Sequence, residues 1–122
     1  MLPMAATLLF GGAALAVPIT IGTTVTAATG DLTITNGETA GPGDDVIVTG
    51  TGKLNAVSGS VFINTGDDVD LQAGSAITAA NAVHLNAGVS DVDGIGDITI
   101  AGSIQASSPV AAVAGPVTTR SP

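Results

Sequence analysis

The chain has 122 residues, 17 of them glycine, and it contains no cysteine, tryptophan or tyrosine. Because it has only two phenylalanines, it lacks the large aromatic anchors that most globular cores use. Ten acidic residues outnumber two basic ones for a formal net charge of −8. This excludes nucleic-acid binding and polybasic membrane attachment, which need clustered Lys and Arg, and the lack of cysteine excludes disulfides and thiolate sites.

Residues 1–29 form an apolar leader without charged side chains. Residues 5–17 have the length of the hydrophobic region of a signal peptide, and both 14–16 and 25–27 have the small residues of a cleavage site. The leader departs from such signals because no Lys or Arg precedes it. Its glycines and prolines and the β-branched run 19–26 argue against a transmembrane helix. We therefore expect an export signal or its remnant; the alternatives are a membrane anchor, a first solenoid coil and a disordered leader.

From Gly30 the pattern changes to a period of two residues. Leu32 and Ile34 alternate with polar side chains, and the pair 36–37 (Asn-Gly) is a turn signal. The segment 38–43 (ETAGPG) reads as a loop, because its proline cannot donate to a strand ladder. One short strand followed by a loop is predicted here.

Two segments that begin with GDDV, at Gly43 and Gly66, repeat each other. The aligned pairs are Val46 and Val69, Leu54 and Ile77, and Ala56 and Ala79 at a spacing of 23 residues, and Val61 and Val83, Ile63 and Leu85, and Asn64 and Asn86 at a spacing of 22. A period of this length indicates a solenoid.

Each copy divides into three short apolar segments separated by Gly, Asn or Asp. The expected strands are 46–48, 54–56 and 61–63 in the first copy and 69–71, 77–79 and 83–85 in the second. Isolated strands this short are not stable, so each must pair with the equivalent strands of neighbouring coils. Three strands per coil predict an all-β chain folded as a parallel β-helix.

A shorter third copy occupies 96–106, after an apparent insertion at 89–95 (VSDVDGI). The last residues, 107–122, contain three prolines and no alternation, which predicts a linker or disordered tail. The predicted organisation is thus a leader (1–29), about three coils (30–106) and a tail (107–122). No polar cap closes this stack, so we expect a fragment of a longer protein or a piece that packs against neighbouring coils of another chain.

The phrases GDLTITNG, GDDVDLQAGSAITAANAVHLNAG and GDITIAGSIQA resemble the coils of bacterial filamentous-haemagglutinin-type and autotransporter adhesins. The resemblance covers Gly30 to Ala106. It implies a right-handed parallel β-helix, export to the bacterial surface or medium, and a role in adhesion, aggregation or delivery of a distal effector. No secretion-directing domain, translocator barrel or long array of coils accompanies these coils in the sequence.

The acidic doublets are the sharpest candidates for a site. Asp44 and Asp45 lie 23 residues before Asp67 and Asp68, so stacking places the four carboxylates about one strand spacing, ~4.8 Å, apart. The first doublet resembles the nonapeptide of calcium-binding β-rolls, in which turn oxygens enclose Ca²⁺. That nonapeptide recurs every nine residues, so the alternative is a set of solvated turn acids. Asp97 is assigned to a second acidic loop, in the insertion region.

Other polar residues indicate structure more than chemistry. Asn64 and Asn86 are expected to stack as a turn ladder. His84 is expected on the outer surface, with Phe62 or Asp70 as its neighbour, and without the second titrating partner that a general base needs. No catalytic constellation is found, although Lys53 and Asp70 allow a glycan-acting β-helix enzyme as a remote alternative.

We therefore expect a non-enzymatic structural or adhesive β-helix segment of an exported bacterial surface protein. Its expected partners are a host or cell-surface receptor or glycan, and neighbouring coils. The alternative is a calcium-binding, β-roll-like secreted module; no other cofactor is expected.

Overall fold

The computed structural model of the chain describes residues 6–10, 18–37, 43–88, 96–108 and 110–114. These ranges contain strands and no helix, so the prediction of an all-β chain is confirmed. It follows that the described residues include no helix that could span a membrane.

All strand pairs are parallel, and the strands form three sheets. Sheet A has, in spatial order, β1 (Ala6–Phe10), β4 (Leu32–Asn36), β7 (Val61–Thr65), β10 (Val83–Ala87) and β13 (Val110–Ala114). Sheet B has β11 (Ile98–Ile100), β8 (Val69–Leu71), β5 (Val46–Val48) and β2 (Ile19–Ile21). Sheet C has β12 (Ser103–Ala106), β9 (Ala76–Ala79), β6 (Lys53–Ala56) and β3 (Thr24–Ala27).

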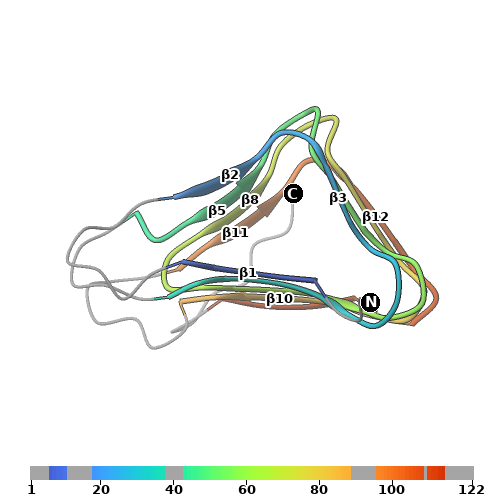
Figure 1. Cartoon of the computed structure of the whole chain (residues 1–122). Helices are drawn as coiled ribbons and strands as arrows, with labels where there is room; N and C mark the ends of the chain where they lie inside the picture. The colour runs from blue at the N-terminus through green and yellow to red at the C-terminus, as the bar shows by residue number, and fades with distance from the viewer. Residues whose placement is uncertain (1–5, 11–17, 38–42, 89–95, 109, 115–122) are drawn as a thin grey trace.

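The chain visits the sheets in a fixed order. It passes from sheet B to sheet C to sheet A and then returns to sheet B, so that successive circuits stack on one another. Figure 1 shows the result along the stack: the three sheets form the sides of a triangle, and equivalent strands overlie one another. This architecture is consistent with the predicted parallel β-helix.

The strand register reproduces the internal repeat. Val46 pairs with Val69 and Leu54 with Ile77, both at the predicted spacing of 23 residues. The 22-residue pairs of sheet A are also found, from Val61 and Val83 to Asn64 and Asn86. The one-residue difference is accommodated in the turn between sheets C and A, where 57–60 overlies 80–82.

The third copy also aligns as predicted. Ile98 pairs with Val69, and Ile104 pairs with Ile77. The loop predicted at 38–43 and the insertion predicted at 89–95 fall, except for Gly43, outside the described residues.

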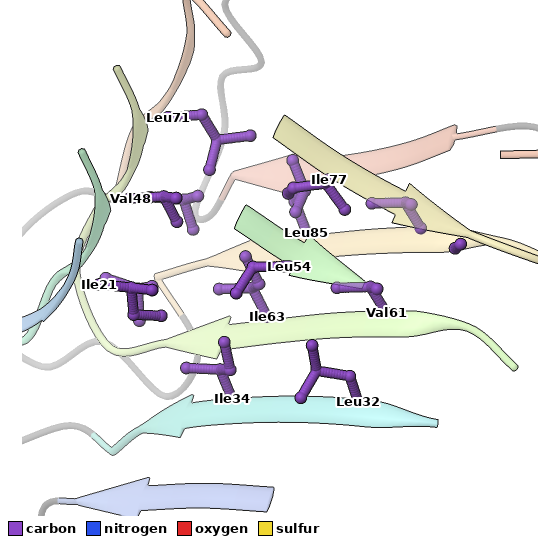
Figure 2. Close-up of a cluster of buried hydrophobic side chains, with 14 of the residues drawn as sticks. Ile21, Leu32, Ile34, Val48, Leu54, Val61, Ile63, Leu71, Ile77 and Leu85 are labelled. Carbon is purple, nitrogen blue, oxygen red and sulfur yellow. The ribbon is translucent and has the colours of Figure 1, made fainter. Parts of the chain in front are cut away.

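The core is a set of columns of aliphatic side chains that point into the triangle (Figure 2). Alternation decides which residues enter: in β4, β7 and β10 every second residue is buried and the residues between are half-buried. The largest fully buried side chains are Leu32, Ile34, Val46, Val48, Leu54, Val61, Ile63, Val69, Leu71, Ile77, Leu85 and Ile98. Each contributes on the order of 1.5–3 kcal/mol by leaving water, so a core without aromatic residues is sufficient.

The predicted boundaries differ from the structure at both ends. β2 and β3, within the proposed leader, pair in register with β5 and β6, which matches the alternative of a first solenoid coil. Their Ile-Thr-Ile and Thr-Val-Thr-Ala sequences are β-branched and suit strands. At the other end, the tail is not without structure, because β13 pairs with β10. Alternation is hidden there because alanine occupies both inward and outward positions.

Replacing an inward side chain will destabilise the fold far more than replacing its outward neighbour. Ile77 is 1% exposed, whereas the next residue, Thr78, is exposed. We expect Ile77→Ala to lower the free energy of unfolding by about 2–5 kcal/mol, because it leaves a cavity in the core. Thr78→Ala is the matched control and is expected to change it by less than about 1 kcal/mol. Urea unfolding followed by circular dichroism measures both; equal losses would contradict the inward assignment.

Candidate functional site

The candidate site lies at the corner where the chain leaves sheet A and enters sheet B. Both acidic doublets directly precede strands of sheet B, β5 and β8. Alternation separates the members of each doublet: Asp44 and Asp67 are buried, whereas Asp45 and Asp68 are half-buried. The four aspartates that the sequence grouped therefore form two columns with different surroundings.

In the buried column, Asp67 binds the turn that precedes it in the stack. Its Oδ2 accepts hydrogen bonds from the backbone N–H groups of Gly43, at 2.5 Å, and Asp44, at 2.8 Å. The Thr65 hydroxyl donates to the carbonyl oxygen of Asp44 and accepts from the N–H of Asp67. Gly43 has a φ of 110°, a conformation that favours glycine. The GDD sequence thus forms a hydrogen-bonded corner, because one carboxylate satisfies two backbone donors.

The half-buried column contains three aspartates, one more than the sequence predicted. Asp45 Oδ1 accepts from the N–H of Asp68 at 3.0 Å, and Asp68 Oδ1 accepts from the N–H of Asp97 at 2.8 Å. Each carboxylate therefore binds the backbone of its counterpart in the next circuit. The pairing of Ile98 with Val69 places Asp97 opposite Asp68. The matching order of Gly, Asp and apolar residues in the third copy was the sequence signal for this position.

These three carboxylates border a groove of about 300 Å³ on the outer side of sheet B, which we call the acidic groove. It is lined by Asp45, Ile47, Asp68, Val69, Asp70, Asp97 and Thr99. Lys53, the basic residue in the described part of the chain, is not among them; its ammonium donates to the carbonyl of Gly74 at 3.0 Å. The described lining of the groove therefore contains negative charge and no cation.

Burial and mutual repulsion make two of these carboxyl groups weaker acids. Burial is the main cause that raises the pKa of Asp45, and the nearby carboxylates, Asp68 first among them, add to it. The pKa of Asp68 is raised by burial and then by Asp97. The N–H donors within the column oppose both shifts, but they do not cancel them. Ionising this column therefore costs the folded chain free energy.

The described residues include no group of three or more His, Asp or Glu side chains placed to hold a metal ion. The predicted calcium set is divided, since Asp44 and Asp67 are buried in the corner and Asp45 and Asp68 border the groove. The groove can attract cations by its charge, while each of its paired carboxylates already accepts a backbone N–H. Calcium binding stays a prediction for these residues.

The remaining predicted residues lie on the outer side of sheet A. Asn86 Nδ2 donates to Asn64 Oδ1 at 2.8 Å, so the expected asparagine ladder is present, within β7 and β10 and not in the turns. His84 is half-buried and its ring is parallel to that of Phe62, with 5.0 Å between centroids. Asp70, the other neighbour considered for His84, lies in the acidic groove on sheet B.

Removing the Asp67 carboxylate will destabilise the corner. In Asp67→Ala, the N–H groups of Gly43 and Asp44 lose their acceptor, and we expect a loss of about 1–3 kcal/mol in the free energy of unfolding. Asp67→Asn keeps an oxygen at this position and is expected to lose less. Chemical unfolding of both variants measures the difference. A neutral Asp67→Ala would show that the corner does not depend on this acceptor.

The acidic column will make stability depend on pH. Below 3.8, the ordinary pKa, the Asp45 carboxyl is protonated in both the folded and the unfolded chain. As pH rises through the raised folded pKa, the unfolded chain ionises first, so the folded state loses stability. Asp45→Asn is therefore expected to be more stable relative to wild type at pH 7 than at pH 3.

Thermal unfolding of Asp45→Asn and wild type at both pH values measures this difference. Repeating it at about 1 M salt separates the causes, because salt screens repulsion between carboxylates more than it changes the cost of burial. A stability difference that is the same at both pH values, or larger at pH 3, would contradict the raised pKa.

Comparison with known proteins does not add a relative. A scan against protein-family models, a search of curated proteins and a search of solved structures each found no match. The functional argument therefore depends on the sheets, the groove and the outward side chains described above.

Proposed function

We propose that this chain is a structural or adhesive β-helix segment of an exported bacterial surface protein, and that it acts by contact and not by catalysis. The observation that supports this most directly is the in-register stacking of three parallel sheets, since such stacking produces long, continuous outer faces on a rigid frame. The resemblance of its repeats to adhesin coils points the same way.

The outer faces differ in chemistry, which supports a binding role. On sheet A the outward positions include the stacked Phe62 and His84 and the Asn64–Asn86 ladder. Flat rings beside amides suit contacts with a receptor or glycan, because rings stack on apolar ligand faces while amides donate and accept hydrogen bonds. The face of sheet B has the acidic groove instead. Sheet A is therefore the proposed face for an uncharged ligand.

The finer architecture is also part of this proposal. We infer a right-handed helix, because connections between parallel strands of one sheet are right-handed in about 98% of cases. The strand sets β2–β4, β5–β7, β8–β10 and β11–β13 support four coils, one more than the sequence predicted. The additional coil comes from the strands at the two ends.

A test of adhesion uses beads coated with the full chain and monolayers of epithelial cells. We expect bead binding above that of albumin-coated beads, and a loss of about tenfold in Phe62→Ala, as for removal of one aromatic contact residue. Thr78→Ala, on the outer side of sheet C, is the matched control and should bind normally. Periodate treatment of the cells separates glycan from protein receptors. Binding equal to that of albumin would contradict the adhesive role.

The calcium-binding alternative is favoured by the convergence of aspartates on the acidic groove. If calcium binds there, thermal unfolding in about 1 mM calcium will shift upward relative to unfolding in a chelator, because a ligand of the folded state stabilises it. Asp68→Asn should reduce that shift. Identical melting curves in calcium and chelator would exclude this function.

A further inference from the structure

The two ends of the stack present unpaired edges that match each other. At one end the outermost strands are β1, β2 and β3, and at the other they are β13, β11 and β12. In sheets A, B and C these edge strands have 5, 3 and 4 residues at the first end and the same lengths at the second. All belong to parallel ladders that run in one direction. One end is therefore a template for strands like those at the other.

The apolar core is incompletely covered at these same ends. The partly buried hydrophobic residues that pack against the core are Val25, Ile100, Ile104 and Ala106, and all four lie in edge strands. Val110, at an inward register position, is 44% exposed, whereas its partner Val83 is fully buried. Inward side chains are thus left partly in water where the described stack ends.

We propose that a second copy of this chain docks head to tail on this end, with its β1, β2 and β3 extending sheets A, B and C beyond β13, β11 and β12. The contact continues the pairing found within the chain. In sheet B the Ile-Thr-Ile of β11 would meet the Ile-Thr-Ile of β2. In sheet C Ile104 would meet Val25, which continues the column Val25–Leu54–Ile77–Ile104.

This arrangement is heterologous, because each copy uses one end to bind the opposite end of the next. Such contacts do not close when the repeat is a translation along an axis, so they produce filaments and not a fixed dimer. The net charge of −8 per copy opposes assembly at low ionic strength. We therefore expect longer assemblies as salt concentration rises.

One contact of the stack is not reproduced at the junction. Pro18 precedes β2 at the position that Asp45 has before β5. Proline has no N–H, so it offers no donor to the Asp97 carboxylate of the adjoining copy. The new ladder in sheet B therefore begins at Ile19. The inference is independent of adhesion, because it concerns only the ends of the stack.

The mass of the full chain tests the proposal. Sedimentation from about 1 µM to about 1 mM is expected to show species that grow with concentration and salt. Val110→Lys places a charge on the inward side of the exposed end and should reduce association at least tenfold. Ala111→Lys, on the same strand but outward, opposite His84, is the matched control and should assemble like wild type. Circular dichroism verifies that both variants keep their β-structure.

A mixing experiment tests the head-to-tail arrangement. Val25→Lys blocks the first end, and its outward neighbour Thr26→Lys is the control. Alone, Val25→Lys and Val110→Lys should each be monomeric, and an equimolar mixture should form dimers, because each variant retains one intact end. Dimers formed by Val25→Lys alone would indicate a tail-to-tail contact and overturn the proposal. A wild-type chain that stays monomeric to about 1 mM would also overturn it.

Discussion

Every strand of this protein depends on a parallel neighbour in register. The strands have three to five residues, and most contribute two or three inward side chains, too few to form a core alone. Stacking changes this balance, because each backbone satisfies its hydrogen bonds above and below while like side chains form continuous columns. The three-sided core is thus a product of repetition, and it needs neither aromatic residues nor disulfides.

The interior of the repeat was predictable because its two copies are adjacent and similar. Val46 and Val69, or Leu54 and Ile77, occupy inward positions that differ by one residue type or none, so alignment alone fixed their register. The ends were harder to predict. The apolar leader has the composition of an export signal, and alanines hide the alternation of β13. Only the pairing of these strands with β5, β6 and β10 distinguishes them from a leader and a tail.

The acidic corner was predicted as a cluster but not in its geometry. The spacing of the doublets placed four carboxylates together, yet alternation puts Asp44 and Asp67 inside and Asp45 and Asp68 at the groove. Asp97 joined them because a shortened third copy still aligns its strand with β8. The sequence could not show that the carboxylates would accept backbone N–H groups of adjacent circuits. That depends on the path of the corner, which residue type does not determine.

The separation between paired strands has a consequence for the rate at which the chain folds. Partners in every ladder lie between 22 and 29 residues apart, so the chain contains no short-range hairpin from which folding could begin. The first two circuits must close loops of this length before any contact compensates the lost entropy. Each later circuit closes a loop of similar length onto a template that already exists. Folding should therefore be slow to nucleate and then spread in either direction along the stack.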